Sequence, residues 1–425
     1  MNIFEFRNRW ITLVLLAWRN LWRHRRRTFI TLSSVALGFS LAVASIGLQD
    51  GSHNSMVRNG IRMGEGHITI QPQDYRDSPA NYRFIGDGNK LAQSLSTLQF
   101  EGRIAPRIAL QVLANTASNS VGAILEGIDP EADPRVGQFR GKLVTGNWIE
   151  STDARGVVVG SNMARKLKLE TGRKLVIMIG KRGGDPEARL ALVRGIFNTG
   201  IDALDSYYIV SGMEFARHFL IAEGGNAELA PVTRVALYLD DADQLETWLP
   251  AIGKQVKEPG IAVLGWPEMM PELLQFIAID DGFSYVMFFL ILFVVVIGIL
   301  NTVLMSVLER TREFGLLRAL GLSRDYLLAL VFCESLLLSF LAVAVGWILG
   351  GSFHLYLAFY GIDFSALVPE GTEVMGTVMD PVVRSELSMT RVVQLTSIIF
   401  MATLASGIYP AIKAARVTPI EALRT

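Results

Sequence analysis

A short run of charged and apolar residues, 308–325, has the spacing of an amphipathic helix that binds another protein. The residues that could form its binding surface are Glu309, Arg310, Glu313, Phe314, Leu317 and Leu320. The three apolar residues fall on one helix face, and the charged residues surround the start of that face. Gly321 predicts the end of the helix, because glycine tolerates left-handed geometry. The chemistry indicated is docking into a groove on a partner, with a helix lying on a membrane surface as the alternative.

Residue types suited to catalysis or metal binding occur without a recognisable pattern. The histidines are scattered, at His24, His53, His67, His218 and His354. Residues 253–255 lack the first glycine and the hydroxyl residue of a phosphate-binding loop. Neither G-x-S-x-G nor H-E-x-x-H occurs, and the single cysteine, Cys333, excludes disulfides. We predict that the chain is not an enzyme and holds no metal or cofactor of its own.

Four apolar segments must position the docking helix. They are residues 28–48, 283–305, 326–349 and 392–412. Each has roughly twenty residues with almost no charge, enough to cross a hydrocarbon layer of about 30 Å as a helix. Half of the residues are hydrophobic and the formal net charge is zero, so no nucleic-acid-binding surface is indicated. One span followed by a large insertion and three further spans predicts a membrane α-helical protein with a 1+3 arrangement.

Arginine clusters predict the orientation of these spans. Basic residues concentrate in segments 1–27, 306–325 and 413–425. With four spans these three segments lie on one side, and the positive-inside bias makes that side the cytoplasm. The insertion 49–282 and the loop 350–391 are then expected outside, and both termini inside. A cleavable signal peptide is the alternative for the first span, but its apolar stretch is too long for one.

The segment 1–27 before the first span has a helical pattern. Its apolar residues share one face, at Ile11, Val14, Leu15, Trp18 and Trp22. Its polar residues fall on the other face, at Asn8, Arg19, Arg23 and Arg26. This pattern predicts an interfacial cytoplasmic helix with tryptophans at headgroup depth, against the alternative of a simple charge cluster that sets topology.

The insertion 49–282 is predicted to fold as a mixed α/β domain. Strand-like runs lie at 67–70, 156–159, 174–179 and 235–239, and helical runs at 162–167, 213–222 and 241–255. A boundary between two subdomains is expected within 188–231. The first span is predicted to continue as a helical stalk over 48–61, and a second stalk over 271–283 leads into the second span.

Several residues in or beside the spans carry two interpretations each. Glu334 is either a functional ionisable group or a side chain bonded to a neighbouring helix. Asp280 and Asp281 either gate substrate entry or mark the water boundary. Three glycines that could permit close helix packing are Gly346, Gly350 and Gly351.

The run 309–321 resembles the coupling-helix signature of the FtsX/MacB-type ABC transporter permeases. The C-terminal run 409–424 resembles the terminal motif of that family. Residues 127–130, and 195–201 with Asp205, are similar to the MacB-like periplasmic core domain. The glycine-isoleucine-phenylalanine segment within 195–201 is most similar to the lipoprotein-releasing LolC/LolE branch.

The resemblance implies an architecture and a set of partners. It implies four transmembrane helices, with an inserted α/β periplasmic domain of MacB core-domain type, in a bacterial inner membrane. Two permeases, identical or related, would assemble with a cytoplasmic ABC ATPase dimer that binds ATP and Mg. ATP hydrolysis would drive mechanotransmission to the periplasmic domain, releasing a lipoprotein or other amphiphile to a periplasmic acceptor. A lipoprotein exporter would present an apolar cavity between the first spans of its two protomers. The residues that could line it, or could equally face lipid, are Val35, Phe39, Ala42, Val43, Ile46, Phe288, Leu292 and Val295.

Three other functions stay open at this stage. The chain could resemble FtsX in the narrow sense and regulate a periplasmic cell-wall hydrolase without moving a substrate. It could resemble MacB and export drugs or peptides. A sensor or binding protein without an ATPase partner is the third, and the coupling-helix signature argues against it.

Overall fold

The computed structural model describes residues 3–416 except 24, 99, 182–183, 257, 369–370 and 376. The chain separates into two compact units. Unit 1 comprises Met1–Asn54, Ile277–Phe364 and Val382–Thr425, and unit 2 comprises Ser55–Phe276 and Ser365–Pro381. The C-terminal part of the predicted tail, 417–425, and His24 lie outside the described residues.

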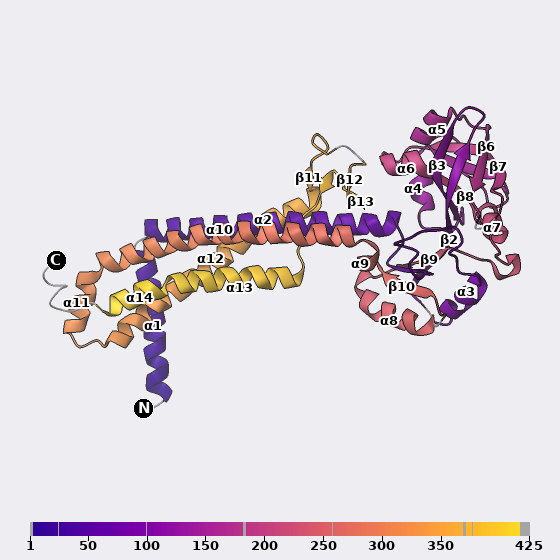
Figure 1. The fold of residues 1–425 in the computed structure, drawn as a ribbon. Helices are drawn as coiled ribbons and strands as arrows, with labels where there is room; N and C mark the ends of the chain where they lie inside the picture. The colour runs from indigo at the N-terminus through magenta and orange to yellow at the C-terminus, as the bar shows by residue number, and fades with distance from the viewer. Residues whose placement is uncertain are drawn as a thin grey trace. The chain divides into compact units, whose positions relative to one another are not determined.

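Unit 1 is built mainly from long helices (Figure 1). They are α1 (Ile3–Arg23), α2 (Arg25–Met63), α10 (Pro271–Glu309), α11 (Thr311–Ala319), α12 (Arg324–Tyr360), α13 (Met389–Ser406) and α14 (Ile408–Ala415). Among the described residues, four helical stretches are long and apolar enough to cross a membrane: α2, α10, α12 and Met389–Ala415. A short hairpin pairs β11 (Ile362–Asp363) with β14 (Val382–Val383).

These helices extend beyond the predicted spans. α2 continues to Met63 and α10 begins at Pro271, so both predicted stalks are helical, and each helix contributes residues to both units. α12 runs on to Tyr360, which corrects the predicted start of the loop 350–391. Gly361 then ends α12 with a φ of 70°, a conformation that suits glycine.

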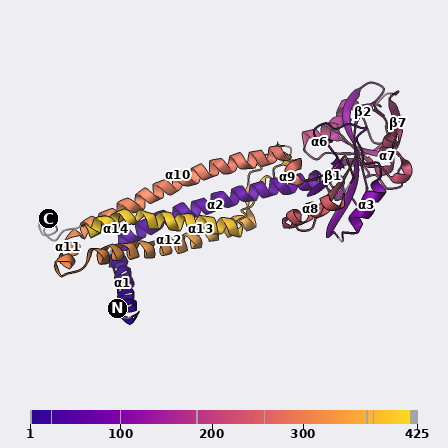
Figure 2. The same cartoon turned by 60° about the horizontal axis from the view of Figure 1, so that its bottom comes forward.

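The core of unit 1 forms where α2, α10, α12 and α13 pack together (Figure 2). Six of the eight residues predicted to line a substrate cavity are buried in it: Val35, Phe39, Ala42, Val43, Ile46 and Phe288. The other two, Leu292 and Val295, are half-buried against the same cluster. The six buried side chains therefore fill the interior of the chain's own bundle and do not line a cavity in this structure, and the cavity at Leu292 and Val295 stays a prediction.

Glycines bring the helices of this bundle close together. A Cβ at Gly346 would lie 2.3 Å from the Phe39 ring, and one at Gly350 would lie 3.0 Å from Cα of Ser40. The predicted close packing is confirmed at these two positions. Gly351 instead faces Trp347 of its own helix.

A segment that follows β14 also packs on a glycine-bearing face of α2. The carbonyl of Gly47 accepts a 2.8 Å hydrogen bond from the Glu386 amide. A Cβ at Gly51 would lie 1.8 Å from the carbonyl oxygen of Arg384. Gly51, which lowers the helix propensity of the stalk, is thus required by the close approach of this backbone.

Unit 2 contains a large sheet flanked by short helices. Its strands are β1 (Ile68–Pro72), β2 (Gly102–Asn115), β3 (Ser120–Ile128), β4 (Leu143–Gly146), β5 (Gly156–Gly160), β6 (Lys174–Ile179), β7 (Glu187–Phe197), β8 (Tyr208–Gly212), β9 (Arg234–Leu239) and β10 (Ile261–Gly265). They follow the order β10-β1-β9-β2-β3-β8-β5-β7-β4. β6 pairs with both β2 and β7, which closes part of the sheet into a ring. A separate small hairpin pairs β12 (Glu373–Val374) with β13 (Thr377–Val378).

The helices of unit 2 are short. They are α3 (Gly88–Ser96), α4 (Val136–Arg140), α5 (Ser161–Leu167), α6 (Asp202–Tyr207), α7 (Met213–Ala222), α8 (Leu245–Gln255) and α9 (Trp266–Met269). The predicted α/β character is confirmed, and the bounds of β6 and α7 agree with the prediction. The helix expected from residue 241 begins instead at Leu245, after the 3₁₀ turn Ala242–Gln244.

The two largest hydrophobic cores among the described residues of unit 2 divide it into halves. One core involves β1, β9, β10, α3 and α8, and the other involves the second half of β2 with β3, β5 to β8, α5 and α7. The long strand β2 belongs to both, since it pairs first with β9 and then with β3 and β6. The chain passes from the second of these cores to the first between Leu220 and Val232, which overlaps the predicted boundary region 188–231.

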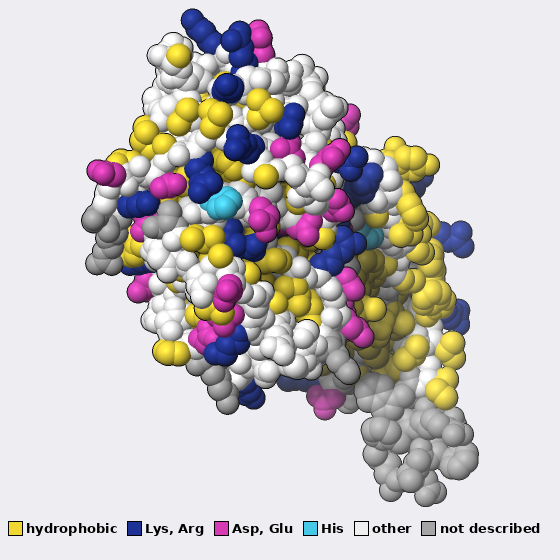
Figure 3. All heavy atoms as spheres, turned by 90° about the vertical axis from the view of Figure 1, so that its right-hand side faces the viewer, with side chains coloured by type: hydrophobic (Ala, Val, Ile, Leu, Met, Phe, Trp, Pro, Cys, Tyr) yellow, Lys and Arg dark blue, Asp and Glu magenta, His cyan; other side chains and the backbone are white. Residues whose placement is uncertain are grey.

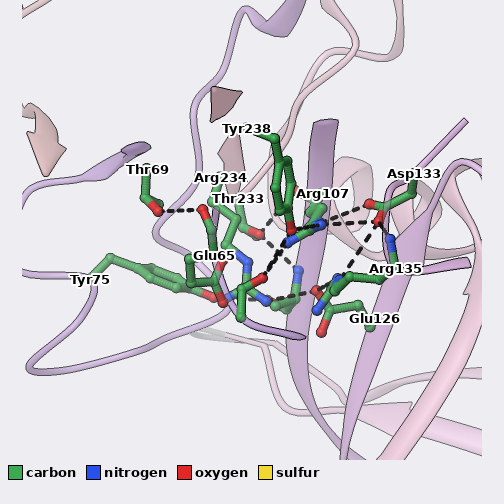
Figure 4. A network of polar contacts seen from close by, with 12 residues as sticks. Glu65, Thr69, Tyr75, Arg107, Glu126, Asp133, Arg135, Thr233, Arg234 and Tyr238 are labelled. Carbon is green, nitrogen blue, oxygen red and sulfur yellow. Dashed lines mark hydrogen bonds and ion pairs between the residues drawn. The ribbon is translucent and has the colours of Figure 1, made fainter. Parts of the chain in front are cut away.

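A buried polar network joins the end of α2 to β2 (Figure 4). Arg107, which is fully buried, donates hydrogen bonds to both Asp133 carboxylate oxygens, at 2.8 and 3.0 Å. It also donates to the carbonyl of Gly64, at 2.7 Å, and to the Tyr238 hydroxyl, at 2.7 Å. A helix-end carbonyl and a buried carboxylate are thereby satisfied by one guanidinium.

Glu126 on β3 is a second centre of this network. Its Oε1 atom accepts hydrogen bonds from Arg135, at 2.6 Å, and from Arg234, at 2.7 Å. Arg234 also pairs with Glu65, just beyond α2. Burial by itself would raise the pKa of Glu126, but Arg135 and Arg234 outweigh it and hold that pKa well below its ordinary value.

Candidate partner-docking site

The connection between α10 and α12 has the local structure that the sequence predicts. α11 ends at Ala319 with Leu320 as its C-cap, and Gly321 follows with a φ of 97°. Ser323 then caps α12, its hydroxyl accepting a hydrogen bond from the Tyr326 amide at 3.2 Å. These local signals are capping interactions between residues close in the chain, which is why the sequence predicts them.

Phe314 faces inward from α11. Its side chain is fully buried in a cluster formed by Val307, Leu327, Val331, Ala411 and Ala414. The Arg310 guanidinium lies 5.1 Å from the centre of the Phe314 ring. The prediction that Phe314 enters a partner's groove is wrong for this structure, because α10, α12 and α14 already enclose it. Leu317 packs partly against the same cluster.

The outward face of α11 carries a different set of residues. Arg312, Leu316, Ala319 and Leu320 are exposed and recur at helical spacing. Leu316 is 56% exposed and Leu320 is 74% exposed. Of the three predicted apolar docking residues, Leu320 is thus the one that is fully available to a partner.

The predicted rim charges are engaged within the chain. Glu309 pairs with Arg27 at the start of α2, at 2.9 Å, and Glu313 pairs with Arg23 at the end of α1, at 2.9 Å. These contacts are largely solvent-exposed, so they contribute modestly to stability. Both arginines belong to the basic segment that predicts topology, and the sequence signal for this pairing is the opposite charge of the two segments.

Arg310 and Glu334 form the centre of a third contact between these helices. Arg310 lies 3.1 Å from Glu334 on α12 and 3.3 Å from Glu313. Asn20 on α1 donates a 2.7 Å hydrogen bond to the Glu334 carboxylate. The interpretation of Glu334 as a side chain bonded to neighbouring helices is confirmed.

The helix α1 packs on α12 through the face that carries Leu13 and Ala17. Leu13 and Ala17 are buried against Leu330 and Cys333. The apolar residues predicted to face the interface are on the outer side, where Ile11 and Leu15 are more than half exposed. Trp18 and Trp22 contact each other edge to face, with ring centres 5.7 Å apart. The interfacial location of α1 stays a prediction.

At the other end of the same bundle, Asp280 and Asp281 of α10 make polar contacts with α2 and α13. Asp280 accepts a 2.9 Å hydrogen bond from Gln49 and lies 2.9 Å from His53. Asp281 pairs with Arg391 on α13, at 3.2 Å. No prediction was made for Arg391, although an arginine in the first turn of an apolar helix is a usable signal for such a pair.

The surface of unit 2 differs from that of the apolar helices. On the face drawn in Figure 3, acidic and basic side chains of unit 2 are interspersed with hydrophobic ones. Mixed charges of this kind are typical of a domain that faces water.

Comparisons with known families cover most of the chain. Residues 28–254 match the family described as MacB-like periplasmic core domain. Residues 285–419 match the family described as FtsX-like permease C-terminal. The first match spans nearly all of α2 and most of unit 2, and the second includes α11 and the helices around it.

Individual relatives match this chain over nearly its whole length. An uncharacterised ABC transporter permease of Methanocaldococcus jannaschii is 22% identical, over 97% of both chains. The lipoprotein-releasing system transmembrane protein LolC of Neisseria meningitidis is 19% identical, over 93% of this chain and 94% of the relative. The macrolide export ATP-binding/permease protein MacB of Shewanella oneidensis is 24% identical, over 94% of this chain and 58% of the relative. The chain therefore belongs to the ABC transporter permeases that combine a MacB-like periplasmic core domain with an FtsX-like permease region.

Proposed function

We propose that this chain is the permease subunit of an ABC transporter whose separate ATPase subunits bind ATP and Mg and drive it from the cytoplasm. The family implies an ATPase partner. In our proposal the partner docks on the outward face of α11, through Leu316 and Leu320, with Arg312 beside them. Their exposure supports this assignment, since an apolar pair on a charged surface gains stability when a partner covers it.

The proposed location is a bacterial inner membrane, with both termini and α11 cytoplasmic and unit 2 periplasmic. The arginines beside α1 and α11 support this orientation. The interspersed charges of unit 2 support its exposure to water.

The observation that carries the mechanism is the continuity of two helices. α2 and α10 each have 39 residues, and each extends from unit 1 into unit 2. At the docking end, Arg27 of α2 pairs with Glu309, the last residue of α10. ATP-driven movement of α11 would therefore pass to both helices at once and from them to unit 2. In unit 2, the network around Arg107 ties the end of α2 to the sheet.

The proposed substrate is a lipoprotein or another amphiphile, taken from the outer leaflet and passed to a periplasmic acceptor. The full-length match to LolC supports it. Export of a macrolide or peptide is the second candidate, favoured by the match to MacB. We propose that two permeases, identical or related, form the functional assembly. The exposed apolar side chains of α10, among them Phe283 and Val294, are available to a second permease or to lipid.

The decisive test is reconstitution with candidate ATPases, using a fluorescent lipoprotein and a macrolide as alternative substrates. We expect ATP-dependent release of the lipoprotein to a periplasmic acceptor. Release of the macrolide alone would favour the second candidate, and a stable ATPase complex that releases neither substrate would contradict transport.

A glycine-serine insertion after Asp50 separates transmission from assembly. We expect this variant to bind the ATPase and hydrolyse ATP but to release no substrate, because the insertion interrupts α2. A matched insertion in the turn at residues 224–225 should leave release intact. Normal release by the first variant would rule out rigid transmission through α2.

A further inference from the structure

An open cavity of about 830 Å³ lies beside the junction of α1 and α2, at the end of unit 1 that carries α11. Its walls come from this junction and from the last turns of α10. Neither the family matches nor the proposed docking face assigns a role to this space. Four arginines line it: Arg23, Arg25, Arg26 and Arg27.

The cavity carries an excess of positive charge. Glu309 is the one acidic residue among the described residues that line it. Arg27 is paired with Glu309, and Arg23 is paired with Glu313. Within the described part of the chain, Arg25 and Arg26 have no ion pair, and both side chains are exposed. Two guanidinium groups are thus left to bind an anion, and phosphate geometry suits them.

The wall formed by α10 adds neutral polar groups. Asn301 is exposed, and its amide can donate and accept hydrogen bonds. Thr302 donates its hydroxyl hydrogen to the Gly298 carbonyl, at 2.7 Å, which leaves its oxygen as an acceptor. Such groups match the hydroxyls and esters around the phosphate of a glycerophospholipid.

The remaining walls are apolar and exposed. Ile30 on α2 is 65% exposed, and Met305 on α10 is 51% exposed. Exposed apolar side chains continue along both helices away from the arginines, at Leu37 on α2 and Ile297 on α10. A ligand of this site would meet charge at one end and hydrocarbon at the other. An amphiphile fits both ends, whereas a free ion would use only the charged end.

We propose that this cavity is a binding site for an acidic phospholipid. Arg25 and Arg26 hold the phosphate, Asn301 bonds to the headgroup, and an acyl chain lies along Ile30 and Met305. The neighbouring pair Trp18 and Trp22 on α1 is consistent with headgroup depth, where tryptophan is enriched. The inference does not depend on which substrate the transporter moves.

The test measures lipid retained by the purified full-length chain, using native mass spectrometry after exposure to equal amounts of phosphatidylglycerol and phosphatidylcholine. We expect the wild type to retain phosphatidylglycerol in preference. Each arginine near an acidic lipid accounts for roughly a fivefold preference, so Arg25→Gln with Arg26→Gln should lower the preference about 25-fold. The charge-conserving pair Arg25→Lys with Arg26→Lys should retain most of it.

A matched control is Arg324→Gln with Arg416→Gln, which removes the same charge from exposed positions that do not line the cavity. The control should retain phosphatidylglycerol as the wild type does. Equal losses in the two glutamine variants would overturn the site in favour of diffuse attraction by surface charge. Unchanged retention in the Arg25/Arg26 variant would overturn it outright.

A second measurement separates a lipid from free phosphate. We expect Ile30→Ser to lower phosphatidylglycerol retention severalfold, because the acyl chain loses an apolar contact. Inorganic phosphate in excess should displace little of the lipid from the wild type. Full displacement by inorganic phosphate, or retention unaffected by Ile30→Ser, would show an anion site and overturn the lipid assignment.

Discussion

Substitutions on the two faces of α11 should have opposite consequences for folding and for ATPase binding. Leu320 is 74% exposed in the isolated chain. Burying a leucine side chain contributes about 1.5–3 kcal/mol. If a partner covers the exposed three-quarters, Leu320→Ala should lose about 1–2 kcal/mol, which weakens the binding of the ATPase roughly 5- to 30-fold. The melting temperature of the permease should change little, because the side chain makes few contacts inside the chain.

Phe314→Ala should behave in the reverse way. Its side chain is fully buried between α10, α12 and α14. Truncating a buried phenylalanine costs about 3–5 kcal/mol, partly through the cavity that is left. We expect faster amide hydrogen exchange in α11 and α14 and a lower melting temperature. Weaker ATPase binding should then appear only as a result of this local loosening.

The assay pairs an ATPase titration with hydrogen exchange on each variant. Ile412→Ala on α14 serves as a control, because Ile412 is 39% exposed and lies off α11. The reasoning would be refuted if Phe314→Ala abolished ATPase binding with normal exchange protection while Leu320→Ala bound as the wild type does. That result would mean that α11 turns its buried face outward when the partner binds.

Three further perturbations test the packing of each unit. Gly346→Leu should lower the melting temperature, because a Cβ there would lie 2.3 Å from the Phe39 ring and overpacking costs about 1–3 kcal/mol; a melting temperature equal to that of the wild type would show that the bundle rearranges freely. Arg107→Met removes the closest partner of the buried Asp133 carboxylate, which keeps a longer contact to Arg135, and should cost up to about 3–5 kcal/mol, detected as faster hydrogen exchange along β2; unchanged protection would contradict the role of the network. The pKa of Glu126 lies below its ordinary value, so its contribution to stability is present above the unfolded-state pKa of about 4.3 and is lost as the pH falls below that value. Thermal unfolding of unit 2 monitored at neutral and acidic pH should therefore show a decrease on the acid side, and a pH-independent transition would contradict it.

Predictions from the sequence were reliable where neighbouring residues decide the outcome. The end of α11 at Gly321 and the start of α12 at Ser323 depend on backbone conformation and capping within a few positions. The apolar runs and the strand β6 depend on hydrophobicity and alternation along one segment. The prediction that a helix begins at residue 241 was wrong, because a 3₁₀ turn precedes α8 there and the apolar pattern does not distinguish the two kinds of helix.

Long apolar helices, an inserted α/β domain and a capped helix between two of the apolar helices all follow from local sequence patterns. Which face of each helix is buried follows instead from packing between distant segments. Phe314 and Phe39 belong to apolar stripes that could equally face a partner, lipid or the core, and only the arrival of distant helices places them inside. The pairing of Glu65 with Arg234 likewise joins residues far apart in the chain. Periodicity specifies that a helix has an apolar face, but the packing partner of that face is fixed by the free energy of the whole assembled bundle.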